Sequence, residues 1–400
     1  MSEKAPQAIF PNRRMRVGIV AGEASGDTLG AALIAAMRAR VPDVQFFGMA
    51  GPKMVVAGCE AWVSSDELGV MGLVEVITHL PRLLKVRRSL LERFQEAQPD
   101  VVVGIDVPDF NLGLAKKLKR SGLRTVQYVS PQVWAWRQGR VRTIGESVDL
   151  VLCLLPFETQ FYEAHGVRAE FVGHPLADQI PLEIDRAGAR EALGIDPSAT
   201  VVALLPGSRL GEVERLGADF VAAAAWIAQH RPGTKFVAPM ASRRVRESFE
   251  TLRASVPGAP PIDVLEGQAQ RALAAADGVI VASGTATLET TLSKRPMVVA
   301  YRLGGVTAFL LRRLGLVKVP YFSQPNLLLG RRRVPEFFQE AVTGPALGEA
   351  LLEQIADPAE VAQLQKEFLG VHELLRRGGA DRAAAAILDY MGVRPYERFA

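Results

Sequence analysis

The chain lacks several features that would place it in other protein classes. It has only two cysteines in 400 residues, Cys59 and Cys153, both in apolar sequence contexts. This indicates buried thiols in a reducing compartment. No hydrophobic run approaches the roughly 18 residues of a membrane span. A secretory signal is not expected, because Glu23 and Asp27 closely follow the short apolar run 17–21. We therefore expect a cytoplasmic protein, or one attached to a membrane only at its surface.

Two kinds of ligand motif are also missing. The Gly-x-Gly-x-x-Gly spacing of dinucleotide-binding loops does not occur, and neither does Asp-x-Asp or a His/Cys cluster. We therefore expect no cofactor and no metal ion. The formal net charge of +4 is modest and does not indicate a nucleic-acid partner.

The composition that remains is that of a soluble globular protein, with 48% hydrophobic and 22% charged residues. Because 400 residues are too many for one core of ordinary size, two domains are expected. Short apolar runs alternate with helical stretches in both halves, which predicts an α/β fold: two Rossmann-like domains whose parallel sheets face a central cleft. The predicted domains cover residues 14–180 and 190–375, with a C-terminal helix at 380–400 completing the first.

The first predicted loop lies between a strand at 15–21 and a helix at 28–40. It contains Glu23, Ser25 and Asp27. Loops at this position commonly contact ligands in doubly wound sheets. Two carboxylates would repel a pyrophosphate and suit a hydroxyl-rich ligand such as a sugar. An equally weighted alternative is that Asp27 only caps the helix.

Asp106 stands where the apolar strand 101–105 ends. A carboxylate at this edge of a sheet, in apolar company, would be partly desolvated, as suits a general base. The alternative is that Asp109 or Asn111 caps the next helix while Asp106 braces the loop. Asp106 is the preferred base and Asp109 the reserve.

A tryptophan-rich stretch follows the strand predicted at 125–129. Trp134 and Trp136 stand beside Arg137 and could form the floor of a sugar or acyl site. They could equally be core residues. His174, just before the predicted linker, is interpreted as a hydrogen-bonding residue of the hinge.

The second domain carries the predicted phosphate site. A buried strand at 279–282 leads into Ser283, Gly284 and Thr285 and then a helix, whose N-terminus suits an anion. Glu289, one turn later, could grip ribose hydroxyls; alternatively, Thr285 caps the helix and Glu289 is solvated. After the strand at 201–205, Ser208 and Arg209 form a tight loop where the guanidinium could bind a phosphate.

Two segments mix basic and apolar residues. The helical stretch 73–91 is one, and the run 306–319 followed by Arg331, Arg332 and Arg333 is the other. Such patterns fit an anionic membrane surface or a lipid tail, although an ordinary surface helix is the commoner explanation for the first.

Six motifs together resemble the lipid-A-disaccharide synthase family. They are residues 22–27 (GEASGD), 104–111 (GIDVPDFN), 128–137 (YVSPQVWAWR), 205–209 (LPGSR), 282–289 (ASGTATLE) and 325–328 (PNLL). The resemblance extends from about residue 15 to residue 392.

This resemblance implies a GT-B-fold, inverting, metal-independent glycosyltransferase. It would join UDP-2,3-diacylglucosamine to 2,3-diacylglucosamine 1-phosphate, giving UDP and the β-1,6-linked lipid A disaccharide precursor. The resemblance places the general base on Asp106 and the phosphate-binding arginine on Arg209. Elements for the uridine diphosphate fall on Ser283, Gly284, Thr285 and Glu289, with Asn326 nearby. It also implies work at the cytoplasmic face of the inner membrane and, in some members, homodimers that exchange C-terminal segments.

Three other functions share some of these features. A UDP-N-acetylglucosamine 2-epimerase or a peptidoglycan glycosyltransferase would use the same architecture, but neither fits the tryptophan-rich stretch as well. A non-enzymatic nucleotide-sugar sensor or membrane scaffold would need the phosphate site of the second domain but not Asp106.

Overall fold

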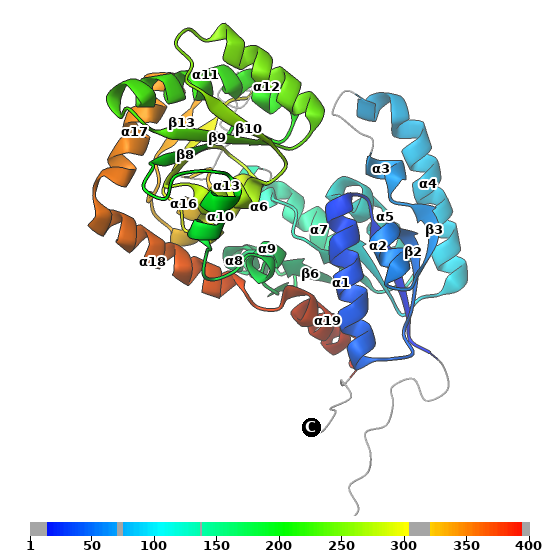
Figure 1. Cartoon of the computed structure of the whole chain (residues 1–400). Coiled ribbons are helices and arrows are strands. Elements are labelled where there is room, and N and C mark those ends of the chain that lie inside the picture. The colour runs from blue at the N-terminus through cyan, green and yellow to red at the C-terminus, as the bar shows by residue number, and fades with distance from the viewer. Residues whose placement is uncertain (1–13, 70–74, 137, 304–320, 394–400) are drawn as a thin grey trace, which may run out of the picture. The chain divides into compact units, whose positions relative to one another are not determined.

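The computed structural model describes residues 14–69, 75–136, 138–303 and 321–393. The chain forms two compact units: unit 1 comprises Met1–Asp178 and Leu375–Ala400, and unit 2 comprises Gln179–Leu374. Each unit is an α/β structure built on one parallel sheet (Figure 1). The predicted fold class of two Rossmann-like domains with parallel sheets is confirmed.

The sheet of unit 1 has the strand order β3-β2-β1-β4-β5-β6-β7. Its strands are short apolar runs, and successive residues of β1 enter opposite cores: Val17 and Ile19 pack on one face of the sheet, Val20 on the other. Such two-sided burial is typical of parallel strands. The strands are β1 (Arg16–Ala21), β2 (Gln45–Ala50), β3 (Cys59–Ser64), β4 (Val101–Ile105), β5 (Thr125–Tyr128), β6 (Leu150–Cys153) and β7 (Ala169–Phe171).

The strand order reverses between β1 and β4, which are neighbours in the sheet. The chain leaves β1 toward β2 on one side and leaves β4 toward β5 on the other. The carboxyl ends of two strands at such a switch point form a crevice that open α/β sheets use for ligands. In unit 1, this is the position of the loops that contain Glu23 and Asp106.

The helices of unit 1 connect these strands, and one comes from the far end of the chain. Helix α19 (Gly379–Tyr390) packs on α1 (Ala24–Arg40) (Figure 1). Ile387 and Leu33 share a core there, and Arg40 pairs with Asp381 at 2.7 Å. The remaining helices are α2 (Pro52–Val56), α3 (Asp66–Gly69), α4 (Glu75–Ala97), α5 (Pro108–Arg120), α6 (Val133–Trp136), η1 (Gln138–Arg140), α7 (Val141–Ser147), α8 (Pro156–Glu163) and α9 (Pro175–Gln179).

Unit 2 repeats the same design with the strand order β10-β9-β8-β11-β12-β13. The order here reverses between β8 and β11, so the loops that follow these two strands form the second switch point. The strands are β8 (Val201–Leu205), β9 (Lys235–Met240), β10 (Ile262–Glu266), β11 (Gly278–Ala282), β12 (Met297–Tyr301) and β13 (Glu336–Phe338).

The helices of unit 2 cover both faces of its sheet. Helix α17 (Gly344–Ala356) lies against α11 (Leu210–His230), and the contact requires glycine: a Cβ on Gly348 would come within 2.7 Å of Trp226. The others are α10 (Arg186–Ala192), α12 (Arg243–Ser255), α13 (Ala269–Ala275), α14 (Thr285–Leu292), α16 (Gln324–Leu329), η2 (Gln339–Ala341) and α18 (Pro358–Leu375).

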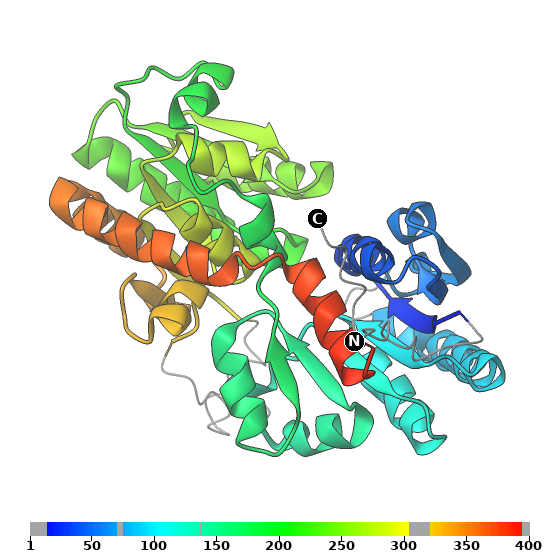
Figure 2. The ribbon, with the colours of Figure 1, turned by 90° about the horizontal axis from the view of Figure 1, so that it is seen from below.

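The chain passes between the units twice, near residue 178 and near residue 375. Figure 2 shows the end of α18 running into the short segment before α19. Asp178 fixes this segment, because its carboxylate accepts hydrogen bonds from the backbone N–H groups of Gly378 (2.9 Å) and Gly379 (2.7 Å) at the start of α19. Among the described residues, no helix combines the length and apolarity needed to cross a bilayer.

Candidate active site

Asp106 lies at the switch point of unit 1, directly after β4. Its N–H donates to the Tyr128 carbonyl at 3.0 Å, and its own carbonyl accepts hydrogen bonds from the side chains of Asn111 (2.8 Å) and Gln127 (3.1 Å). The residue is half-buried. Its carboxylate has no hydrogen bond or ion pair with any described residue. The backbone is thus held at three points while the acidic group stays available for a ligand.

The backbone around Asp106 is strained. Asp106 has φ of +53°, Val107 of +38° and, at the end of the neighbouring strand, Val129 of +74°. Positive φ is rare outside glycine, and for a β-branched residue it is a genuine outlier. Such strain persists only where the surroundings enforce it, and it tends to cluster at functional sites. Its location at two adjacent strand ends supports the choice of Asp106.

The predicted residues after β1 divide into two groups. Glu23 and Ser25 are exposed at the start of α1. Asp27 is buried, and its two carboxylate oxygens accept hydrogen bonds from the backbone N–H groups of Lys53 (2.9 Å) and Met54 (3.0 Å). Asp27 therefore caps α2 rather than its own helix. The predicted ligand contact of Asp27 gains no support, because the side chain is buried and both of its oxygens accept backbone N–H groups.

Asp109 and Trp134 are each held by a specific partner. Asp109 is 81% exposed on the first turn of α5, and its carboxylate pairs with Arg140 at 2.5 Å. The indole N–H of Trp134 donates to the carboxylate of Glu158 at 3.1 Å, and the Trp134 ring meets Phe157 edge-on. The ion pair makes Asp109 a weaker candidate base than Asp106. Arg137 and the side chain of Trp136 lie outside the described part of the chain.

The loop after β8 holds Ser208 and Arg209, both exposed. Their backbone N–H groups donate to Oε2 of Glu212 at 3.1 and 3.3 Å, while Oε1 of Glu212 accepts from the Arg209 guanidinium at 3.2 Å. Gly207 makes room for this carboxylate, since its φ is +137° and a Cβ there would lie 2.4 Å from Glu212. An acidic side chain thus occupies the two N–H groups that a phosphate would otherwise approach.

The loop after β11 is more open. Gly284 has φ of +144° and, like Thr285, is exposed at the start of α14. Ser283 is less available, because its hydroxyl donates to the Phe322 carbonyl at 3.1 Å. The side-chain carboxylate of Glu289, one turn into α14, has no hydrogen-bond partner among the described residues, and burial raises its pKa. This combination suits a phosphate at the helix N-terminus with hydroxyl groups beside Glu289.

Asn326 is placed differently from the sequence prediction. It is fully buried, and its amide donates to the Val334 carbonyl (3.0 Å) and to Glu336 (2.9 Å). Its amide oxygen accepts from the N–H groups of Arg333 (2.7 Å) and Val334 (3.0 Å). Both the nitrogen and the oxygen of the side-chain amide are therefore bonded within unit 2, which gives the predicted nucleotide contact no support. Asn326 joins α16 to the segment that leads into β13, and α16 in turn reaches α14 through a bond from the Gln324 N–H to the Thr287 hydroxyl.

Two residues that organise these loops were missed by sequence reasoning. Glu336 accepts hydrogen bonds from both the N–H and the hydroxyl of Ser323 as well as from Asn326. Glu158 is buried and bonded to Trp134. An acidic residue inside an otherwise apolar segment is a weak signal of such a role. The partners stand 10 and 24 residues away, so the sequence does not indicate the pairing.

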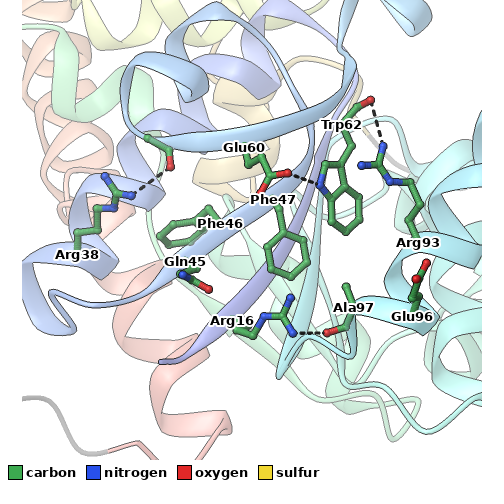
Figure 3. Close-up of a pocket in the computed structure, with 11 residues that line it drawn as sticks. Arg16, Arg38, Gln45, Phe46, Phe47, Glu60, Trp62, Arg93, Glu96 and Ala97 are labelled. Atoms are coloured by element: carbon green, nitrogen blue, oxygen red, sulfur yellow. Dashed lines mark hydrogen bonds between the residues drawn. The ribbon is translucent and has the colours of Figure 1, made fainter. Parts of the chain in front are cut away.

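A cavity of about 580 Å³ lies away from these loops, at the amino ends of β1 and β2 (Figure 3). Two of its arginines serve as helix C-caps: Arg16 donates to the Ala97 carbonyl at 2.5 Å, and Arg38 to the carbonyl of Ala57 at 2.8 Å. Trp62 stacks on Phe47 with ring centroids 4.7 Å apart. These side chains already have structural partners, so the cavity is not assigned to the chemistry. Within the described ranges, no cluster of His, Cys, Asp or Glu side chains could hold a metal ion.

The fold defines the class of protein. Each of the two units is a Rossmann-like fold on a parallel sheet, and solved structures with TM-scores above 0.5 share this GT-B type of fold. A UDP-GlcNAc 2-epimerase from Neisseria meningitidis has a TM-score of 0.60 at 12% identity, covering 94% of this chain and 99% of that one. The calicheamicin glycosyltransferase CalG4 has a TM-score of 0.56 at 16% identity, covering 95% and 99%. At such identities the likeness shows the fold alone.

Sequence similarity identifies the family. Residues 17–388 match the family model described as lipid-A-disaccharide synthetase. The lipid-A-disaccharide synthase of Pectobacterium atrosepticum is 49% identical over 383 residues, covering 96% of this chain and all of that protein. The Pseudomonas aeruginosa enzyme is 52% identical over 375 residues, covering 94% and 97%. The chain belongs to the lipid-A-disaccharide synthetase family and is a glycosyltransferase. The predicted family and enzyme class are confirmed.

Proposed function

We propose that the chain transfers the diacylglucosamine group of UDP-2,3-diacylglucosamine to the 6-hydroxyl of 2,3-diacylglucosamine 1-phosphate. The products are UDP and the β-1,6-linked disaccharide precursor of lipid A. Besides family membership, one observation supports this reaction most: the Asp106 carboxylate, at a strained switch-point loop, has no partner within the described part of the chain. A hydrolase, an epimerase or a sensor would not need a base at this position for an incoming alcohol.

In the proposed mechanism, Asp106 removes the proton from the acceptor 6-hydroxyl as that oxygen attacks the anomeric carbon of the donor. The bond from the anomeric carbon to the diphosphate breaks, its electron pair leaves with UDP, and the configuration at the anomeric carbon inverts. Asp109 is the second candidate base, because taking up a proton would break its ion pair with Arg140. The acceptor sugar is contacted by Glu23, Ser25 and Trp134.

The leaving diphosphate is stabilised by unit 2. Arg209 presents an exposed guanidinium whose planar fork matches two phosphate oxygens. The N-terminus of α14, opened by Gly284 and Thr285, adds N–H groups and the positive end of the helix dipole. The Glu289 carboxylate accepts hydrogen bonds from the ribose hydroxyls. Since Glu212 occupies the N–H groups of Ser208 and Arg209, the proposed contact from this loop is made by the Arg209 side chain, with Ser208 beside it through its hydroxyl.

Membrane contact is proposed through α4. Leu80 and Leu84 are 48% and 45% exposed on this helix, whereas large apolar side chains are usually buried. Arg82 and Arg88 stand among them with exposed guanidinium groups, which pair with Glu67 and Glu92 at 2.7 and 2.9 Å. Basic side chains around an exposed apolar stripe fit an anionic bilayer surface. We therefore propose peripheral attachment at the cytoplasmic face of the inner membrane.

The second predicted membrane surface has less support. Residues 306–319 lie outside the described part of the chain. Arg331 and Arg333 pair with Glu367 on α18 at 2.8 and 2.9 Å, so much of the charge of that triplet is neutralised within unit 2. A homodimer, which the family resemblance implies for some members, is included in the proposal, and sedimentation at micromolar concentration tests it.

One incubation distinguishes the proposed function from its rivals. The purified protein is mixed with both acylated sugars, and released UDP and the disaccharide are quantified. The proposal predicts UDP release that requires the acceptor. An epimerase would convert UDP-N-acetylglucosamine without an acceptor, a peptidoglycan enzyme would ignore the acylated acceptor, and a sensor would bind UDP but release none. Any of those three results would contradict it.

A further inference from the structure

A buried carboxyl group lies behind Trp134. Glu158, on the first turn of α8, is 2% exposed. One of its oxygens accepts the backbone N–H of Leu155 at 3.0 Å, and the other accepts the indole N–H of Trp134 at 3.1 Å. Burying an acidic group without a cation is costly, and such groups are retained where their hydrogen bonds serve a purpose. Within the described residues, Glu158 has no ion pair.

An ordinary capping role explains only half of this arrangement. A glutamate on the first turn of a helix commonly accepts an N–H from just before the helix, as Glu158 does from Leu155. Capping does not require the second bond, which crosses to a different element. That element, α6, carries Trp134, for which the sequence leaves open a place in the floor of a sugar or acyl site. The bond to Trp134 therefore calls for a separate account.

The groups around Glu158 are neutral and polar. Ser130 lies beside it and forms a 3.1 Å hydrogen bond with the hydroxyl of Tyr162 on α8. Among the described residues, the titratable groups that face Glu158 are Tyr162 and the thiol of Cys153 at the end of β6, and burial raises the pKa of both. Burial also raises the pKa of Glu158, from its ordinary value of 4.5 to about 7. The carboxyl group thus changes charge near neutral pH.

The segment that holds Trp134 is fastened at both ends as well. Before it, the amide of Gln127 donates to the carbonyls of Asp106 (3.1 Å) and Val129 (3.3 Å), which joins it to the loop of the proposed base. After it, Arg140 pairs with Asp109 at the start of α5. Between these two attachments, Glu158 holds the indole N–H of the tryptophan, and Phe157 packs against its ring.

Resting on the proposed function, we propose that Glu158 is a positioning residue: its carboxyl group holds the indole of Trp134 in the orientation that receives the acylated sugar acceptor. Glu158 acts through Trp134 and does not touch the reacting atoms. The ionised form holds the indole more strongly than the protonated form, because a hydrogen bond to a charged acceptor is stronger. The effect appears in the KM for the acceptor and leaves the KM for the UDP-sugar unchanged.

The first test is kinetic and uses the full-length protein. In the wild type, the acceptor KM falls as pH rises from 6 to 8. Glu158→Gln removes the ionisation, raises the acceptor KM at pH 8 by on the order of tenfold and abolishes the Glu158-dependent part of the pH profile. Glu163→Gln, an exposed acid on the same helix, is the matched control and is expected to behave as wild type. The phosphate of the acceptor also titrates in this range. Its effect on KM is the same for every variant and cancels when the variants are compared.

A second variant tests whether Glu158 acts through the tryptophan. Trp134→Phe keeps an aromatic ring but removes the N–H, so it is expected to raise the acceptor KM by a similar factor. The double variant should then be no worse than either single one. Additive effects, an unchanged acceptor KM in Glu158→Gln, or an equal rise in the donor KM would each overturn the proposal.

A spectroscopic measurement keeps this proposal separate from the proposed function. The fluorescence of Trp134, taken as the difference between wild type and Trp134→Phe, should titrate with a midpoint near 7 and lose that titration in Glu158→Gln. A flat difference signal in the wild type would overturn the positioning role even if UDP is released normally. Failure to release UDP from the acylated sugars would instead overturn the proposed function, with the fluorescence result still standing.

Discussion

The side-chain amide of Gln127 donates a hydrogen bond to the backbone carbonyl of Asp106 across 3.1 Å. Gln127 is fully buried on β5, and the same amide also reaches the carbonyls of Tyr128 and Val129. One side chain therefore holds two strand ends whose backbones adopt positive φ. We infer that Gln127 maintains the strained conformation from which the Asp106 carboxylate projects.

Replacing Gln127 with methionine, which has a similar size and no N–H, tests this relationship. The Asp106 carbonyl would keep only its bond from Asn111. We expect kcat to fall at least tenfold and the free energy of unfolding to fall by about 1–3 kcal/mol. Gln132→Met on the exposed side of the following loop is the control. Steady-state kinetics and urea unfolding measure the two effects, and a variant with lowered stability but normal kcat would refute the inference.

Arg209→Ala should weaken UDP binding about 10- to 100-fold and slow transfer, because the leaving diphosphate loses a charge-assisted partner. The guanidinium is 84% exposed and bonded only to Glu212 among the described residues, so its removal should scarcely alter the stability of unit 2. Calorimetric titration with UDP measures the affinity. Arg243→Ala removes an equally exposed arginine on α12 and should change nothing. Equal UDP affinities for both variants and wild type would contradict the role.

His174 should make the protein sensitive to acid. Burial lowers its pKa from 6.5 to about 4, and its Nδ1 accepts the N–H of Leu176, which requires the neutral ring. Between these two values the unfolded chain binds a proton that the folded chain does not, so the free energy of unfolding falls as pH falls. We expect a loss of about 2 kcal/mol from this residue between pH 7 and pH 5.

The variant His174→Gln should lose this part of the acid sensitivity. Urea unfolding at pH 7 and pH 5 gives the difference for each protein. The variant is expected to lose less stability over that interval than the wild type, by about the same 2 kcal/mol. An identical loss in both proteins would show that His174 is not the group responsible.

Much of the fold could be predicted because its central strands are short, continuous apolar runs. Burial on both faces leaves no alternative for segments such as 101–105 or 278–282. The edge strands β3 and β13 were missed. Both are partly exposed and contain polar residues, so their composition does not differ from that of a loop.

For the candidate site, the sequence predicts which loops carry it but not which side chains in them face a ligand. Loops that follow predicted strands selected Asp106, Arg209 and Gly284 as candidates, because ligands collect at the carboxyl edge of a parallel sheet. The roles of Asp27 and Asn326 could not be found this way. Their partners lie elsewhere in the chain, and only packing decides whether a polar side chain faces a ligand or caps a neighbouring element.

The general-base role of Asp106 is tested most directly by the turnover of Asp106→Asn with both acylated sugars at saturating concentration. Asparagine keeps the size and the local backbone but cannot take a proton. The proposed mechanism predicts a fall in kcat of about 10²- to 10⁴-fold with UDP affinity unchanged. Turnover close to that of the wild type would contradict it.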